Sequence, residues 1–259
     1  MLAVALLLAQ IPQNPSPLTE TTRRHERVAQ RPAAGPEWTL SMGRLRVPPK
    51  LARKKAVPLV VHFHGAAWLP LQATERHAVL ALELGAGSGR YATPFREKGR
   101  FADWMAEAER VSGRRFSRIY LSSFSAGYGA VREILRGDRA RIQGVLLADS
   151  LHAGYGSEPA DLDSLLALAA DAVRGSLRFV LTHSEVFPGT YASTTETADR
   201  LLDHIRVKRQ AVLRWGPLGM QQLSQAKRGK FEMLGFAGNS APDHVDHLHA
   251  ISAWWKKLR

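Results

Sequence analysis

The 259-residue sequence contains no cysteine. Disulfides, thiolate nucleophiles and cysteine metal sites are therefore excluded, although this says nothing about compartment, because a chain of this length can bury a core without disulfides. Long hydrophobic runs are also lacking. The apolar run at residues 2–9 is too short to span a bilayer, and no positively charged segment precedes it. We expect no stable membrane insertion. Residues 1–36 are interpreted either as an arm with a linker or as an export signal, so cytoplasmic and exported locations both stay open.

Acidic residues are scarce relative to basic ones. The chain has 23 Asp and Glu against 36 Lys and Arg, which gives a formal net charge of +13. The basic residues lie in short clusters, such as 21–27, 51–55 and 226–230, without aromatic residues among them. Nucleic-acid-binding proteins usually gather basic residues on one face and interleave aromatics. We therefore predict a solvated basic surface and no nucleic-acid partner.

The order of apolar and amphipathic segments predicts the fold. Runs that are apolar on both faces are typical of buried parallel strands, and amphipathic stretches with helical spacing lie between them. Residues 37–50 alternate partially, as one or two antiparallel edge strands do. The predicted strands are 57–65, 78–87, 117–127, 142–150, 177–185 and, more weakly, 230–238; the predicted helices are 100–113, 126–138, 159–175, 194–209 and 245–258. We predict one α/β domain over 37–259, with a doubly wound, mostly parallel sheet and at most a small cap at 151–165.

Ligands of such sheets bind beyond the carboxyl ends of the strands, so the residues that end each strand are the candidates for chemistry. In "SSFSAGYGA" (122–130), Ser125 lies between a strand and a helix, with Gly127 two residues later. This pattern is typical of a nucleophile elbow, in which a strained turn holds a serine hydroxyl above the sheet. Ser123 stands where this motif usually has glycine.

A second motif is "VVHFHGAAW" (60–68), a strand that ends in His64 and Gly65. Here the sequence resembles the α/β-hydrolase family. The resemblance implies an oxyanion hole formed by the backbone N–H groups of Ala66 and Ala126. An alternative is a metal pair of His62 and His64 on one side of the strand, but no third ligand lies nearby in the sequence, so we predict no metal.

The same resemblance implies a general base in the loop after the last strand. His244 fits this place if the final helix starts near Val245 or Asp246, and His247 is the alternative base. The acid is predicted to be Asp149, an aspartate at the tip of an apolar strand. Glu185 is the alternative, because it follows the next strand, where the family more commonly has its acid. Asp243 and Asp246 are expected to cap the last helix.

Ser125, an acid and His244 follow one another in the order of the hydrolase family, over residues 57–258. The resemblance implies a serine hydrolase that cleaves a small-molecule acyl substrate, a carboxylic ester, through an acyl-enzyme intermediate, with no cofactor. Aromatic candidates to line the substrate site are Trp68, Tyr91, Tyr128 and Tyr155.

Two other functions stay open at this point. One is a non-catalytic binding protein on a hydrolase scaffold. The other is an S-adenosylmethionine-dependent methyltransferase, suggested by Glu83 and the glycines of "AVLALELGAGSGRYATPF" (78–95). A methyltransferase needs a second carboxylate at the end of the next strand, and that strand offers serines. In the hydrolase interpretation, the glycines form a tight turn near the rim of the active site.

Overall fold

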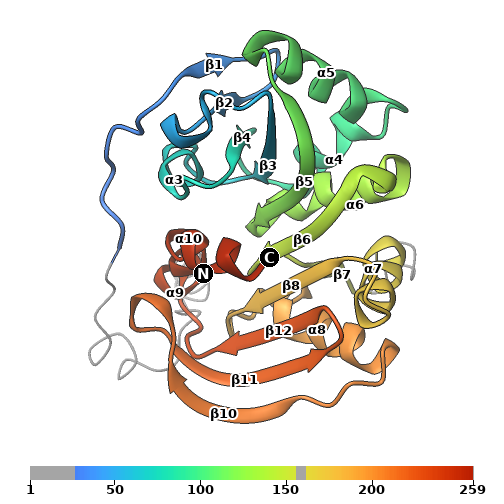
Figure 1. Cartoon of the computed structure of the whole chain (residues 1–259). Coiled ribbons are helices and arrows are strands. Elements are labelled where there is room, and N and C mark those ends of the chain that lie inside the picture. Colours follow the sequence, from blue (N-terminus) through green and yellow to red (C-terminus); the bar gives the residue numbers. More distant parts are fainter. Residues whose placement is uncertain (1–26, 156–161, 259) are drawn as a thin grey trace, which may run out of the picture.

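The computed structural model describes residues 27–155 and 162–258, which form a ten-stranded sheet with helices on both faces (Figure 1). The strand order is β1-β2-β4-β3-β5-β6-β8-β12-β11-β10. The six strands from β4 to β12 are parallel, and the strands outside them are antiparallel. The strands are β1 (Glu37–Thr39), β2 (Arg44–Arg46), β3 (Ala56–Phe63), β4 (Ala78–Leu82), β5 (Arg115–Phe124), β6 (Ile142–Ala148), β8 (Arg178–His183), β10 (Gln210–Trp215), β11 (Gln221–Arg228) and β12 (Phe231–Phe236). The predicted doubly wound, mostly parallel sheet is thereby confirmed.

The helices form two layers, each with its own core cluster. The first layer comprises α4 (Ser88–Phe95), α5 (Arg100–Ser112), α6 (Tyr128–Gly137), α7 (Asp163–Val173) and α8 (Thr194–His204); the second comprises α3 (Trp68–Gln72), α9 (Ala241–His249) and α10 (Ile251–Trp255). Short 3₁₀ turns lie at Pro49–Leu51, Ser125–Gly127, Arg139–Arg141, Pro217–Gly219 and Lys256–Leu258. None of the helices within the described ranges is long and apolar enough to cross a bilayer.

A separate two-stranded sheet lies near the carboxyl ends of the parallel strands. It pairs β7 (Ala153–Gly154) with β9 (Tyr191–Ala192) in antiparallel register. Here the structure describes part of the predicted small cap, while residues 156–161 of that prediction lie outside the described residues. Residues 1–26 of the predicted arm or export signal also lie outside them.

The chain before β1 is attached to the second helix layer. Arg27 pairs with the buried Asp246 of α9 at 3.3 Å, and the backbone N–H of Val28 donates to His249 Nδ1 at 3.1 Å. The backbone N–H of Arg31 donates to the side chain of Gln72 on α3 at 2.8 Å. Residues 27–31 thus hold the helix that carries His244.

The segments 194–209 and 210–228 differ from the sequence expectation. The helix predicted to reach residue 209 ends at His204, because Arg206 adopts a left-handed backbone with φ of 52°. Residues 210–228, to which the pattern assigned no structure, form the hairpin of β10 and β11. The inward-facing residues of β11 include Gln222 and Ser224, so the strand lacks the apolar alternation that would have revealed it.

Candidate active site

Ser125 occupies a sharp turn between β5 and α6. Its φ is 46°, a left-handed conformation that is strained for a residue with a Cβ. Gly127 makes the turn sterically feasible, since a Cβ at this position would lie 2.2 Å from the carbonyl oxygen of Phe63 on β3. The local geometry is that of a serine held on a strained strand-to-helix turn at the carboxyl edge of the sheet.

The departure from glycine at position 123 has a physical explanation. The buried Ser123 hydroxyl hydrogen-bonds the Ser150 hydroxyl at 2.7 Å, and Ser150 Oγ donates to the backbone carbonyl of Ser125 at 2.7 Å. A serine at this position therefore supports the carbonyl of the strained residue through Ser150. Glycine could not make this contact.

Asp149 and His244 are brought together by the fold. His244 Nδ1 lies 2.7 Å from Asp149 Oδ2, although the two residues are 95 positions apart. Asp149 Oδ1 accepts from the Ser184 backbone N–H at 2.9 Å and from the Thr194 hydroxyl at 2.5 Å, and Oδ2 also accepts from the Ser184 hydroxyl at 2.5 Å. Burial acts to raise the pKa of Asp149, but His247, the His244 ring and Ser184 outweigh burial and lower this pKa well below its usual range. The residue is therefore a carboxylate at neutral pH.

His244 lies beside Ser125. Its ring packs on Phe124, the residue before Ser125, with the ring centroids 4.5 Å apart, and both His244 and Ser125 line one cavity. Among the described residues, His244 is hydrogen-bonded to Asp149 and not to the Ser125 hydroxyl. Catalytic hydrogen bonds are often long or misaligned without substrate, so this arrangement is compatible with proton transfer.

The predicted position of His244 in a loop is wrong. Helix α9 begins at Ala241, so His244 lies in its first turn. The reason is a capping box, in which Ser240 Oγ accepts from the Asp243 N–H and the Asp243 carboxylate accepts from the Ser240 N–H. Asp243 is a helix cap as expected, whereas Asp246 instead pairs with Arg27.

The alternative base, His247, and the alternative acid, Glu185, do not belong to the described wall of the cavity that contains Ser125 and His244. His247 is buried, hydrogen-bonds Thr182 Oγ1 through Nδ1 at 2.7 Å and packs against Phe236. Glu185 is exposed, and its carboxylate accepts from the Gly238 N–H at 3.4 Å. The structure therefore pairs His244 with Asp149 and not with Glu185.

His64 departs from the strand that precedes it. His64 has a left-handed backbone with φ of 73°. Ser125 and Asp149, at the same edge of the sheet, are also left-handed, each with φ of 46°. His64 Nδ1 is bonded to the Tyr91 hydroxyl at 2.9 Å, and its ring stacks on Phe124. Such strain persists only where the surrounding structure enforces it, and it is concentrated at functional sites.

The two histidines of the alternative metal pair are both hydrogen-bonded within the protein. His62 is buried, with Nδ1 on Ser122 Oγ at 2.9 Å and Nε2 on the His64 carbonyl at 3.0 Å. His62 packs against Trp255 in the second layer, while His64 turns toward Tyr91, so the two rings do not share a face. In residues 27–155 and 162–258, no group of three His, Asp or Glu side chains is placed to hold a metal ion.

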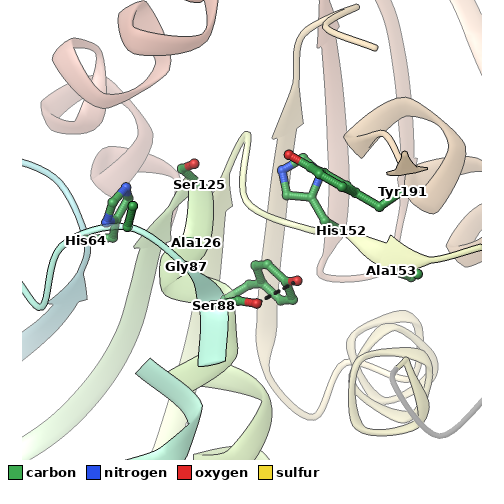
Figure 2. A pocket seen from close by; sticks show the side chains of 11 residues that line it. His64, Gly87, Ser88, Ser125, Ala126, His152, Ala153 and Tyr191 are labelled. Atoms are coloured by element: carbon green, nitrogen blue, oxygen red, sulfur yellow. Dashed lines mark hydrogen bonds between the residues drawn. The ribbon is translucent and has the colours of Figure 1, made fainter. Parts of the chain in front are cut away.

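Two cavities meet at Ser125. Cavity A, of about 360 Å³, contains His64, Gly87, Ser88, Ala126 and Tyr128 in its wall; cavity B, of about 430 Å³, contains Asp149, Val186, Thr194, Ala241 and His244. Ser125, His152 and Tyr191 line both. Figure 2 shows Ser125 between His64 on one side and His152 with Tyr191 on the other.

The glycine-rich stretch 85–89 belongs to the same site. Gly85 and Gly87 have φ of 76° and 97°, and Gly87 precedes the first residue of α4. The Tyr91 hydroxyl accepts from the Leu84 N–H at 2.9 Å while it contacts His64, which fixes the loop beside Ser125. Glu83 is exposed at the end of β4. The loop thus forms a wall of cavity A, as the hydrolase interpretation anticipates for it.

Of the other predicted site residues, some line the cavities beside Ser125 and others do not. Ala126 and Tyr128 line cavity A, whereas Ala66 and Trp68 are half-buried and belong to the described walls of neither cavity. Trp68 instead packs edge-on against His249. Tyr91 is fully buried, and Tyr155 is exposed beside Glu196.

Sequence reasoning missed several polar residues of the site. Ser184 and Thr194 hold Asp149, Ser150 supports Ser125, and His152 lines both cavities. Ser184 directly follows β8 and Ser150 lies two residues after β6, so the rule that polar residues at strand ends form the site applies to both. His152 and Thr194 are placed by β7 and β9, which are too short to give a periodic signal.

Buried neutral histidines predict acid sensitivity. Burial lowers the pKa of His62 to about 3 and of His183 to about 4, against about 6.5 in an unfolded chain. The unfolded state therefore takes up protons first as the pH falls, so stability is complete above pH 6.5 and is lost below it. We expect the free energy of unfolding, measured by urea denaturation, to fall by about 3–4 kcal/mol between pH 7 and pH 5. His62→Gln should remove about half of this dependence; a profile that is flat in the wild type contradicts the assignment.

Comparison with known proteins identifies the fold. No protein-family model matches the sequence, and no curated protein is significantly similar to it. Among solved structures, a ferulic acid esterase superposes with a TM-score of 0.53 at 10% identity, covering 86% of this chain and 95% of that one. The AtxE2 isopeptidase gives 0.51 at 11% identity, covering 86% of this chain and 40% of that one.

The fold class follows from these two likenesses and from the sheet order. The chain has the α/β-hydrolase fold, which confirms the resemblance inferred from the sequence motifs. A thermostable esterase is also similar, with a TM-score of 0.46 at 14% identity and coverage of 82% of this chain. The chain spans only 55% of the length of that esterase and 40% of the length of the isopeptidase.

Proposed function

We propose that this protein is a serine hydrolase that cleaves carboxylic esters through an acyl-enzyme intermediate. The observation that carries the proposal is the His244–Asp149 pair, with 2.7 Å between Nδ1 and Oδ2, on the same cavity wall as the strained Ser125. Two proteins that share this fold, a ferulic acid esterase and the AtxE2 isopeptidase, support acyl transfer as the chemistry.

The roles follow from the contacts of each residue. Because Nδ1 of His244 donates its hydrogen to Asp149, Nε2 is left as the basic nitrogen. His244 takes the proton of Ser125, and the serine oxygen forms a bond to the acyl carbon. The resulting oxyanion is stabilised by the backbone N–H of Ala126 and, as the family resemblance implies, by that of Ala66.

The intermediate then collapses, and His244 returns the proton to the departing alcohol oxygen as the ester C–O bond breaks. Water attacks the acyl-enzyme with His244 again as base, which releases the carboxylic acid and restores the Ser125 hydroxyl. Asp149 stays ionised and stabilises the imidazolium in both half-reactions.

Labelling with a fluorophosphonate tests the mechanism directly. We expect a covalent adduct on Ser125, mapped by peptide mass spectrometry, together with hydrolysis of a 4-nitrophenyl ester. Ser125→Ala should remove the adduct, and Ser125→Ala and His244→Ala should each lower kcat by at least about 10³-fold. Ser252→Ala and His204→Ala, which alter exposed residues, are the matched controls. Folded wild-type protein that forms no adduct and cleaves no ester would rule the mechanism out.

A further inference from the structure

The two cavities have different roles if the proposed function holds, and the present inference rests on it. The leaving oxygen must lie where His244 can protonate it, so the alcohol belongs in cavity B. The carbonyl oxygen must face the backbone N–H of Ala126, a residue that lines cavity A. With the alcohol in cavity B, cavity A is the other described cavity that reaches Ser125, so the acyl group extends into it.

His152, which lines both cavities, carries the hydrogen-bond acceptor that we assign to cavity A. Its Nδ1 lies 3.3 Å from the carbonyl oxygen of Ala192 on β9, and because a carbonyl only accepts, Nδ1 carries the hydrogen. Burial lowers the pKa of His152, so the ring is neutral at pH 7 and Nε2 retains a lone pair. Edge-to-face contacts with Tyr128 and Tyr191, at centroid distances of 5.9 and 5.1 Å, fix the ring.

Ser88 gives the same cavity a donor. The Tyr128 hydroxyl donates to Ser88 Oγ at 3.2 Å, so the Ser88 oxygen is the acceptor in that bond and its own hydrogen can be donated to a ligand. Figure 2 shows this bond below Ser125, in the wall of the cavity. Tyr128 thus contacts both Ser88 and His152, which places the donor and the acceptor around one ring.

The absence of charged side chains from the described wall of cavity A limits the chemical class of ligand that it can bind. The described residues of its wall include no Asp, Glu, Lys or Arg, and burying a charged group without a partner is unfavourable. A neutral group that both donates and accepts satisfies the His152 acceptor and the Ser88 donor, and a hydroxyl does both.

We propose that cavity A selects an acyl group that carries a hydroxyl, which donates to His152 Nε2 and accepts from Ser88 Oγ. The substrate class is then the esters of hydroxy acids. An unsubstituted acyl chain displaces water from the His152 acceptor and the Ser88 hydroxyl hydrogen without replacing its hydrogen bonds, which costs binding free energy in the transition state.

Matched ester pairs test this selection. The probes are the 1-naphthyl esters of 3-hydroxybutyrate and butyrate, and of 4-hydroxybenzoate and benzoate. In at least one pair, we expect wild-type kcat/KM to favour the hydroxy ester by about tenfold or more. His152→Phe keeps an aromatic ring without the acceptor and should bring that ratio to about one, while His152→Gln, which offers an amide oxygen, should restore part of it. His204→Phe, on the exposed end of α8, should keep the ratio.

The inference is overturned if the wild type hydrolyses the esters without a preference in either pair, or if the preference survives in His152→Phe. A second measurement separates this failure from failure of the proposed function. Isothermal titration of Ser125→Ala with the four intact esters reports binding without turnover. Tighter binding of a hydroxy ester, lost when His152→Phe is added, supports the inference even if the wild type hydrolyses none of the esters; equal binding within both pairs contradicts it.

Discussion

Replacing Asp149 with asparagine is expected to lower kcat for a 4-nitrophenyl ester by about 10⁴-fold. The hydrogen bonds around this residue give the reason. The Oδ1 position accepts from the Ser184 N–H and the Thr194 hydroxyl, so the amide oxygen of asparagine is most stable there. The amide NH₂ then occupies the Oδ2 position and donates to His244 Nδ1. His244 is thereby forced to carry its hydrogen on Nε2 and cannot accept the proton of Ser125.

Glu185→Gln provides the matched control. Glu185 is exposed, and its carboxylate contacts the Gly238 N–H at 3.4 Å, so we expect kcat to change by less than about threefold. Circular dichroism and thermal unfolding show whether the Asp149 variant is folded before its activity is compared. The reverse outcome, a large loss in Glu185→Gln and a small one in Asp149→Asn, would assign the acid to Glu185.

Adding one methyl group at Gly127 is expected to destabilise the protein by about 3 kcal/mol or more. The new Cβ would lie 2.2 Å from the Phe63 carbonyl oxygen and 2.7 Å from its carbon, and both atoms belong to the backbone of β3. Backbone in the centre of a parallel sheet cannot move aside without disturbing its neighbours, so the first turn of α6 must lift away from the sheet. Urea denaturation of Gly127→Ala measures the loss, and the soluble yield reports it if the variant does not fold.

Gly137→Ala is the comparison within the same helix. A Cβ at Gly137 meets no atom within 4 Å, so we expect unchanged stability or a gain of up to about 1 kcal/mol from helix propensity. Equal effects of the two substitutions would contradict the idea that helix α6 requires glycine for its close approach to β3.

Much of the fold was predictable because its central strands are buried on both faces. Strands β3 and β6 consist almost entirely of apolar residues, and β5 and β8 each contain a buried apolar run at their centre; such runs leave few alternatives. The hairpin of β10 and β11 was not predictable from the same rule, because Gln222 and Ser224 face inward and are satisfied by hydrogen bonds rather than by apolar contacts.

The candidate site was predictable in part, for a different reason. Chain order and strand ends were sufficient to select Ser125, Asp149 and His244, whose catalytic roles stay predictions. The start of α9 was misplaced although "SAPD" at 240–243 contains both a capping pattern and a helix-favouring proline. His152 could not be selected, because its orientation depends on the pairing of Ala153 with Ala192, a contact between segments far apart in the sequence.

The Trp255 indole N–H donates to Ser122 Oγ at 2.9 Å, and the two residues are 133 positions apart in the sequence. Ser122 lies three positions before Ser125. This bond has a consequence for synthesis of the chain on the ribosome. Strand β5 can pair with its neighbours early, but the polar group beneath the elbow gains this partner only after residues 241–255 have emerged. Closing contacts of such sequence separation is slow. We therefore expect nascent chains that lack α9 and α10 to depend on chaperones, and the site to be assembled only in the last step of folding.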